Sequence, residues 1–275
     1  MLFSSNLLEN IYAFLFIIFL WRENSKFGQK LIIEKGKNKE IKWTSYDADG
    51  SIWLDVQLSF ADILKKNTAE ESESIKNTLI EILHQGHLLN PDFFQNHEGF
   101  DITTQLTFPR NWGLGTSSTL INNIAQWLEI DAFVLLNNSF GGSGYDIACA
   151  QNDSAILYHL ENSNPVVEKV KFEPEFAENL HFVYLEKKQS SKASIVSYYN
   201  NKNKQLAEEI ISNNKITSAV LKAKTLQEFA IALEEHEAEM STILEMLTVK
   251  ESLFSDFNGV IKSLGAWGGD FVLAI

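Results

Sequence analysis

The chain has 275 residues, of which 45% are hydrophobic and 12% aromatic, so it is long enough to bury a sizeable core. Its 36 acidic residues outnumber its 23 basic residues, and the formal net charge is −13. This charge argues against a nucleic acid partner, although backbone N–H groups and a metal ion can still hold a single nucleotide.

The single cysteine, Cys149, excludes an internal disulfide and a cysteine-based zinc cluster, and the composition predicts a cytoplasmic protein. Residues 11–21 form an unbroken apolar run, but a helix that spans a membrane needs about 20 residues. The ten residues before this run include Glu9 and no Lys or Arg, which is atypical of a signal peptide. We therefore expect a buried strand or helix, or a disturbed start of the chain, rather than a membrane anchor.

The first half of the chain predicts four strands and two helices. Short apolar or alternating runs, separated by turn residues, indicate the strands. The spacing of Ile75, Leu79, Ile82 and Leu83 indicates an amphipathic helix. The predicted strands cover residues 30–34, 40–47, 51–60 and 101–109, and the predicted helices cover residues 70–87 and 117–128.

The second half continues with a mixture of strands and helices. The predicted strands cover residues 155–160, 166–172 and 180–188, the helices cover 203–212 and 225–247, and a strand, a glycine turn and a strand follow over 257–275. Strands and helices in this order favour the α+β class, with a break near residues 160–175. The apolar spacing of the helix at 225–247 indicates a stripe that faces a core. The alternative is a surface for a partner, with His236 as a ligand.

A glycine loop at residues 108–120 follows the fourth predicted strand, with the sequence FPRNWGLGTSSTL. Glycines let the backbone approach a ligand closely, and the unpaired N–H groups at the start of a helix attract an anion. The loop lacks the lysine of a P-loop, and Ser118 stands where a dinucleotide fingerprint has its third glycine. The alternative is an ordinary helix cap made by Ser or Thr. These residues alone favour neither interpretation.

Two further glycine-rich stretches follow in the chain. In residues 140–150, FGGSGYDIACA, Asp146 follows three glycines at the start of a helical turn, where a ligand can reach its carboxylate. An aspartate at this position can equally complement the helix dipole. Residues 262–275 place a glycine turn between two apolar strands, which is also typical of a tight hairpin with Trp267 as a packing residue.

The pattern Pro109-x-x-x-Gly113-Leu114-Gly115-Thr116-Ser117 resembles the central phosphate-binding motif of the GHMP kinases, the superfamily of galactokinase, homoserine kinase, mevalonate kinase and phosphomevalonate kinase. The glycine-rich stretches at 140–150 and 262–275 follow in the order of the family's motifs. Their residues, Gly-Tyr-Asp-Ile-Ala and Gly-Ala-Trp-Gly-Gly-Asp-Phe, resemble those of a bacterial mevalonate-kinase-like subgroup. The resemblance extends from about residue 26 to the end. It implies a two-lobed α+β fold, with a ribosomal protein S5 domain 2-like lobe over 1–165 and a ferredoxin-like lobe over 166–275.

The resemblance also implies an activity, the ATP-dependent phosphorylation of a hydroxyl group on a small molecule, either mevalonate or a related metabolite of isoprenoid biosynthesis. Asp146 would orient or deprotonate the acceptor hydroxyl, and Ser117 would contact Mg²⁺. The residues implied to bind ATP are Pro109, Gly113, Leu114, Gly115, Thr116, Ser117, Ser118, Gly265, Gly268 and Gly269. Two alternatives stay open, a decarboxylase that acts on diphosphomevalonate and a catalytically impaired nucleotide-binding homologue. The chain would act as a monomer or a homodimer.

The sequence departs from the family pattern near its start. Residues 1–24 lack the N-terminal motif that often supplies a lysine near the transferred phosphate, and we interpret them as a frame-shifted or misassigned start. Residues 134–140 show no second acidic metal ligand. Three lysines, Lys187, Lys188 and Lys192, could neutralise phosphate charge, or they could form a solvated strand edge, where lysines are common.

Overall fold

The computed structural model describes residues 27–66, 75–187, 206–265 and 269–275 of the chain. These residues form two compact units. The N-terminal unit consists of the described residues of Glu23–Arg110 together with Leu114–Gln151, and the C-terminal unit consists of Asn111–Gly113 together with the described residues of Asn152–Ile275. The lobe boundary at residues 165 and 166 stays a prediction.

Several sequence-based interpretations concern residues outside the described part of the chain. They are the apolar run at 11–21, the atypical segment 1–24, the first residues of the helix predicted at 70–87, and Lys188, Lys192, Trp267 and Gly268. Within the described residues, no helix has both the length and the apolar character needed to cross a membrane.

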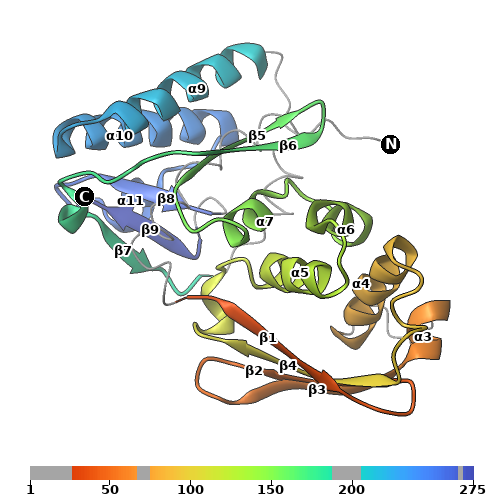
Figure 1. Ribbon diagram of the computed structural model, residues 1–275. Helices are drawn as coiled ribbons and strands as arrows, with labels where there is room; N and C mark the ends of the chain where they lie inside the picture. The colour runs from red at the N-terminus through yellow and green to blue at the C-terminus, as the bar shows by residue number, and fades with distance from the viewer. Residues whose placement is uncertain (1–26, 67–74, 188–205, 266–268) are drawn as a thin grey trace. The chain divides into compact units, whose positions relative to one another are not determined.

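The N-terminal unit is built on a four-stranded sheet in the order β1-β4-β2-β3. Strands β2 and β4 run parallel, and the outer pairs β1–β4 and β2–β3 are antiparallel. Figure 1 shows helices α4, α5 and α6 on one side of this sheet. The strands are β1 (Gln29–Lys35), β2 (Glu40–Tyr46), β3 (Ile52–Ser59) and β4 (Gly99–Leu106), and the helices are α3 (Phe60–Lys65), α4 (Ile75–Leu89), α5 (Thr116–Trp127), α6 (Ala132–Ser139) and α7 (Tyr145–Ala150).

Alternating burial along the central strands explains this layering. Ile41 and Trp43 of β2 and Ile102 of β4 are fully buried and belong to one apolar cluster. Their neighbours in the chain, Lys42 and Asp101, are exposed. This period of two residues is what the sequence pattern predicts for a strand with one buried face. The helices contribute their apolar stripes to the same cluster, so the sheet and α4, α5 and α6 share one core.

Two helices of this unit were not predicted, and each begins at a side-chain cap. The Ser59 hydroxyl accepts a hydrogen bond from the N–H of Asp62, so the chain turns into α3 at Phe60, where the prediction continued the strand. The Asp131 carboxylate accepts hydrogen bonds from the N–H groups of Phe133 at 2.7 Å and Val134 at 3.0 Å, and α6 follows it. In both places the capping residue, Ser59 or Asp131, was the sequence signal that could have predicted the start of a helix.

The C-terminal unit contains an antiparallel three-stranded sheet in the order β7-β9-β8 and a separate hairpin, β5–β6. Helices α9 and α10 lie side by side in Figure 1, and the described elements confirm the α+β class. The strands are β5 (Ile156–Glu161), β6 (Asn164–Lys169), β7 (His181–Tyr184), β8 (Ile261–Leu264) and β9 (Phe271–Ala274), and the helices are α9 (Leu206–Lys222), α10 (Leu226–Leu244) and α11 (Val249–Leu253).

Helix α10 confirms the core-facing stripe predicted for residues 225–247. Its buried positions include Phe229, Leu233, His236 and Met240, which recur at the spacing of one helical face. A capping box starts the helix, with the Thr225 hydroxyl bonded to the Glu228 N–H and the Glu228 carboxylate bonded to the Thr225 N–H. His236 is therefore part of the packed face of α10.

A buried ion pair joins α10 to β8. The Lys262 ammonium lies 2.6 Å from a carboxylate oxygen of Glu237, and both side chains are only 4% exposed. The other Glu237 oxygen accepts from the Ser263 hydroxyl at 3.1 Å, and the Ser263 N–H also donates to this carboxylate. Two buried charges are tolerated here because they are paired and hydrogen-bonded.

Candidate active site

Helix α5 begins directly at the glycine loop. Its N-cap residue is Gly115, which has a left-handed backbone with φ of 69°, and Thr116, Ser117 and Ser118 form the first helical turn. Within the described residues, no side chain caps this helix end. The alternative interpretation, a Ser or Thr cap, is therefore wrong, because the hydroxyl residues lie one to three positions too late. The first N–H groups of α5 stay available to an anion.

The residues before the loop are fixed by local contacts. Strand β4 ends at Leu106, Pro109 follows, and a short 3₁₀ turn covers Arg110–Trp112. The Arg110 N–H donates to the Asp47 carboxylate at 3.1 Å, and the Arg110 guanidinium lies 4.8 Å from the centre of the Trp53 ring. A cation stacked on an indole is held by the ring's negative face, so this arginine is oriented.

Asp146 lies against the start of α5. It occupies the first turn of α7, after the left-handed Gly144, and a Cβ placed on Gly115 would lie 3.4 Å from the Asp146 carboxyl carbon. The structure therefore brings together two residues 31 positions apart, one from each of the first two glycine-rich stretches. Burial raises the pKa of the Asp146 carboxyl, which moves it towards the range useful for a general base.

Cys149 follows Asp146 by one helical turn and is buried. Burial and the neighbouring Asp146 charge both raise the pKa of the Cys149 thiol, while a hydrogen bond with Tyr145 acts in the opposite direction. The thiolate is the reactive form of cysteine, so a thiol kept protonated is chemically inert. Of Asp146 and Cys149 in α7, Asp146 is therefore the residue whose side chain can act as a general base.

A polar contact that the sequence analysis did not identify ties α5 to β1. The Thr119 hydroxyl lies 2.9 Å from the side-chain oxygen of Gln29, and the Asn123 amide donates to the Gln29 carbonyl at 2.9 Å. The Thr119 hydroxyl also donates to the Thr116 carbonyl at 3.0 Å, so both of its contacts are with residues of the N-terminal unit. Ser117, in contrast, is exposed in the first turn. The only available signal for Gln29 was its place at the point where the resemblance to the GHMP kinases resumes.

The predicted residues near the C-terminus belong to the C-terminal unit. Gly265 is exposed, has a φ of 66°, and has open space where a Cβ would stand, whereas Gly269 is buried. Lys187 is exposed, which agrees with a solvated strand edge. The sequence analysis missed the role of Asp270, whose carboxyl packs against Gly113 in this unit.

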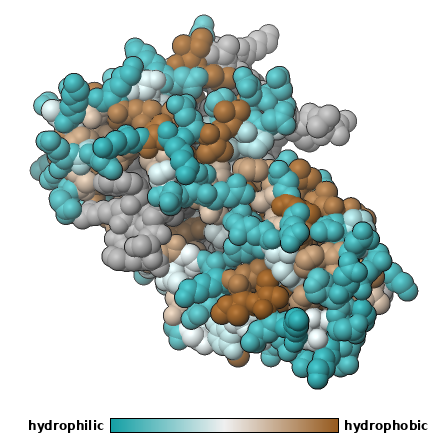
Figure 2. Space-filling model, viewed as in Figure 1, coloured by the Kyte–Doolittle hydropathy of each residue, from teal (hydrophilic) through white to brown (hydrophobic). Residues whose placement is uncertain are grey.

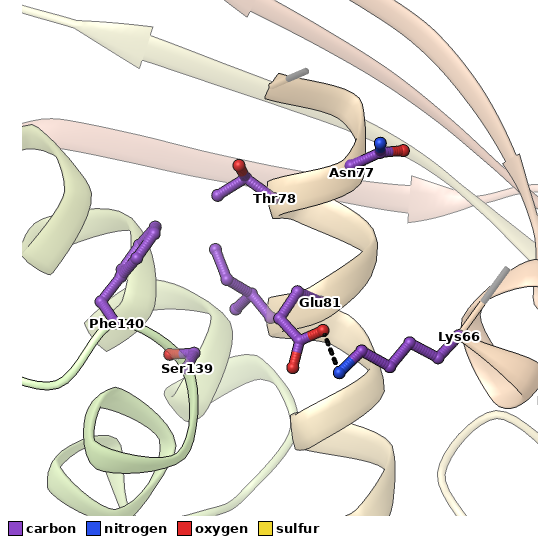
Figure 3. A pocket seen from close by; sticks show the side chains of 7 residues that line it. Lys66, Asn77, Thr78, Glu81, Ser139 and Phe140 are labelled. Atoms are coloured by element: carbon purple, nitrogen blue, oxygen red, sulfur yellow. Dashed lines mark ion pairs between the residues drawn. The ribbon is translucent and has the colours of Figure 1, made fainter. Parts of the chain in front are cut away.

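A cavity of about 320 Å³ lies in the N-terminal unit beside α4 and the end of α6. Figure 3 shows Asn77, Thr78 and Glu81 of α4 on one side and Ser139 and Phe140 on the other. The Lys66 ammonium pairs with the Glu81 carboxylate at 2.7 Å at its edge. Ligand pockets occupy roughly 300–1,000 Å³, so the cavity can hold a small ring system beside an aromatic face, an amide and hydroxyl groups.

The donor set at α5 suits Mg²⁺ bound together with a phosphorylated ligand. Within the described residues there is no cluster of three or more His, Cys, Asp or Glu side chains that could hold a metal ion alone. Mg²⁺ needs few protein ligands, because it usually keeps several waters and binds substrate phosphates. An exposed hydroxyl at Ser117 beside uncapped N–H groups, with Asp146 against Gly115, fits that requirement.

Comparison with known proteins gives matches in structure. No protein-family model and no curated protein matches the sequence. Phosphomevalonate kinase from Streptococcus pneumoniae, solved with phosphomevalonate and AMPPNP, has a TM-score of 0.63 at 16% identity, over 90% of this chain and 82% of its own. Mevalonate kinase from Methanococcus jannaschii has a TM-score of 0.59 at 16% identity, over 90% and 80%. Galactokinase from Lactococcus lactis, solved with galactose, has a TM-score of 0.52 at 12% identity, over 90% and 77%.

These matches show that the chain has the fold of the GHMP kinases. The predicted fold class is thereby confirmed over the 90% of the chain that each match covers. Within this fold the three similar proteins differ in the small molecule that their names specify. The fold alone therefore does not identify an acceptor.

Proposed function

We propose that this chain is an ATP-dependent kinase that phosphorylates a hydroxyl group of a small molecule, with mevalonate or a related metabolite as the acceptor. The observation that carries the proposal is the start of α5, where Gly115 leaves the helix N-terminus uncapped and Asp146 lies directly against it. A phosphate site next to a carboxylate is what phosphoryl transfer to a hydroxyl requires.

The glycine loop would bind the triphosphate of ATP. The backbone N–H groups from Gly113 to Ser118 and the α5 dipole attract the phosphates, and left-handed glycines at 113 and 115 let the backbone approach them. Pro109 lies between the end of β4 and the 3₁₀ turn, and the side chain of Leu114, in the middle of the loop, is buried. Ser117 would hold Mg²⁺, which supplies charge neutralisation when it is bound with ATP. Gly265, Gly268 and Gly269 are proposed to contribute to nucleotide binding from the C-terminal unit.

Asp146 would act on the acceptor hydroxyl. A carboxylate in the first turn of α7 can accept the hydroxyl proton as the oxygen attacks, and a raised pKa makes it a better base than an ordinary aspartate. Such a positioned base contributes about 10²–10⁴ to the rate. The neighbouring Cys149 thiol, whose pKa is raised by burial and by the Asp146 charge, does not compete as a base.

The cavity beside α4 is proposed to receive the adenine base. Phe140 lines it and directly precedes Gly141 and Gly142, which lead to Asp146. A phenyl ring can stack on a base, and Figure 3 shows Asn77 and Thr78 of α4 lining the same cavity. Phe140→Ala should then raise the KM for ATP and leave the KM for the acceptor unchanged.

The acceptor is proposed from the resemblance and from the likeness to mevalonate and phosphomevalonate kinases. Because galactokinase shares the fold, the assignment needs a panel of acceptors. The activity is proposed for the cytoplasm, on the basis of a composition with one cysteine, which is buried.

The test is ATP turnover with Mg²⁺ and a panel of mevalonate, phosphomevalonate, diphosphomevalonate, galactose and homoserine. ADP formation and the mass of the product identify the acceptor, and release of CO₂ from diphosphomevalonate would instead identify a decarboxylase. Asp146→Ala should lower the rate at least 100-fold, as expected for loss of a positioned base. Asp92→Asn, which changes an exposed carboxylate, is the control. Equal turnover by the wild type and Asp146→Ala would overturn the proposal.

A further inference from the structure

The first residues of the glycine loop belong to the C-terminal unit. Asn111, Trp112 and Gly113 pack with residues of this unit, although Leu114 and helix α5 follow them directly in the chain. Their partners lie on strand β7, on strand β9 and just before β9. The contacts involve a ring cluster, a hydrogen bond and a close approach of a carboxyl to a glycine.

Trp112 is held by two aromatic rings. Its ring centre lies 5.8 Å from that of Tyr184 and 5.5 Å from that of Phe271, and the Phe271 contact is edge to face. Tyr184 and Phe271 also contact each other, with their ring centres 5.0 Å apart. The Tyr184 hydroxyl donates to the Asn111 carbonyl at 3.2 Å. Aromatic clusters of this geometry are favourable beyond the area that they bury.

Gly113 is held by Asp270. The Asp270 carboxyl occupies the space where any other residue at position 113 would place its Cβ, and Gly113 has a φ of 71°. Asp270 is buried, and its backbone is fixed on both sides, since its N–H donates to the Lys187 carbonyl and its carbonyl accepts from the Leu185 N–H, each at 2.8 Å. Position 113 therefore needs glycine for two separate reasons, its backbone conformation and the contact with this carboxyl.

We propose that Tyr184 and Asp270 are positioning residues for nucleotide binding, which hold Asn111–Gly113 so that the following loop presents its N–H groups to the phosphates. This role rests on the proposed function. Only Leu114 separates Gly113 from Gly115, where α5 begins, so a displacement at Gly113 passes along the backbone to the phosphate-binding residues. Neither side chain needs to touch the nucleotide for this role.

The first test uses a steric rescue. Gly113→Ala should weaken the binding of MgADP, measured by calorimetry, at least tenfold, because the new Cβ collides with the Asp270 carboxyl and strains φ. Gly113→Ala/Asp270→Ala should bind MgADP more tightly than Gly113→Ala, because the collision is removed. Gly50→Ala is the matched control, since Gly50 has a φ of 81° and open space around its Cα. If the loss of MgADP affinity in the double variant equals the product of the losses in the two single variants, the proposed role of Asp270 is wrong.

The second test removes one hydrogen bond. Tyr184→Phe keeps the rings in contact and should raise the KM for ATP about fivefold, the effect of one neutral hydrogen bond, with the KM for the acceptor unchanged. Asp270→Asn, which preserves shape, should stay close to the wild type, whereas Asp270→Ala should resemble Tyr184→Phe. Asp256→Ala, at an exposed position, is the control for a lost carboxylate. A purely structural role would lower the melting temperature and leave the KM for ATP unchanged.

The outcomes separate this inference from the proposed function. If the wild type binds MgADP and the Tyr184 and Asp270 variants bind it equally well, the positioning role is wrong and the nucleotide site stands. If the wild type binds no MgADP, the proposed function is wrong, and the positioning role fails with it. In that case the melting temperatures of the Gly113 and Asp270 variants still report whether their contact exists.

Discussion

Asp146 combines two properties that oppose each other in a folded protein. Its carboxyl is half-buried against Gly115, and burial raises its pKa. A charge that is poorly solvated lowers the stability of the folded state, but the same environment makes a stronger base. Residues at active sites often lower stability in this way, and the carboxyl of Asp146 fits that pattern.

We predict that Asp146→Asn removes activity and stabilises the chain at pH 7. A carboxyl whose pKa is raised by folding stabilises the folded state below its unfolded pKa of about 3.9, and this contribution is lost as the pH rises through the folded pKa. Asparagine does not titrate. The variant should therefore gain on the order of 1 kcal/mol in the free energy of unfolding at pH 7, a typical size for one substitution.

Urea unfolding between pH 4 and pH 7.5 measures this difference. The gain should shrink as the pH falls towards 4, because a growing share of the wild-type carboxyl is then protonated in both states. Asp92→Asn, at an exposed position, is the control for the loss of one carboxylate. An Asp146→Asn chain that is less stable than the wild type at every pH would mean that the carboxylate supports the fold.

At the scale of elements, the ion pair between α10 and β8 buries two opposite charges in the C-terminal unit. Glu237→Gln should destabilise the chain by about 3 kcal/mol or more, because the Lys262 ammonium loses its counter-charge while both side chains are 4% exposed. The same helix provides a control, Glu234→Gln, which breaks the exposed pair with Lys250 at 3.9 Å. That change should cost less than about 1 kcal/mol.

Chemical denaturation of the two variants at neutral pH checks this prediction. The contrast between the variants is the informative quantity, since both lose one carboxylate from α10. Similar losses for Glu234→Gln and Glu237→Gln would show that the buried pair is not specially stabilising. Replacement of both Glu237 and Lys262 by apolar residues should cost less than Glu237→Gln alone, because no charge is left buried.

The elements that the sequence predicted well are those with a regular apolar period. Alternation over residues 51–60 identified β3, and the helical spacing around Leu79 and Leu233 identified α4 and α10. Helices α3 and α6 were missed, since their signal is one capping residue, Ser59 or Asp131, followed by short apolar runs that fit a strand equally well. Helix α9 extends well beyond the predicted residues 203–212.

The candidate site was predictable only in part, for a physical reason. Glycines and Asp146 stand out in the sequence because their residue types restrict what the backbone and the charge can do there. The resemblance assigned Gly115 and Asp146 to one predicted site. The contact between Gly113 and Asp270, in contrast, joins positions 157 residues apart and depends on tertiary packing. Tyr184 had no local signal, because only the fold brings its hydroxyl to Asn111.

At the scale of the whole molecule, the chain carries a formal net charge of −13. On the face shown in Figure 2, hydrophilic residues cover most of the surface and the apolar patches among them are separate. The most exposed large apolar residues, Ile211 at 69% and Leu247 at 68%, lie at different places along the chain. Single exposed apolar residues are normal on protein surfaces, and they carry no argument for a partner here.

The division of the chain into units makes a prediction for Trp112. In the full chain Trp112→Ala should lower the free energy of unfolding by about 1–3 kcal/mol, as expected when a packed aromatic ring is lost. In a fragment of residues 27–151, which contains the entire large apolar cluster, the same substitution should have little effect because Tyr184 and Phe271 are absent.

Thermal unfolding of the four proteins, followed by circular dichroism, measures both effects. The fragment itself should unfold cooperatively, since its core lies within the N-terminal unit. An equal loss from Trp112→Ala in the fragment and in the full chain would place the stabilising contacts of this ring within residues 27–151.

The membership of Asn111–Gly113 in the C-terminal unit sets a rule for protein engineering. The chain leaves the N-terminal unit after Arg110, enters it again at Leu114, and leaves it a second time after Gln151. A chimera that exchanged only residues 152–275 with a protein of this fold would join a foreign sheet to the native Trp112 and Gly113. The donor's residues at the positions equivalent to 111–113 have to be transferred together with its C-terminal unit. The grafted strands then keep the residues that they pack against in the donor.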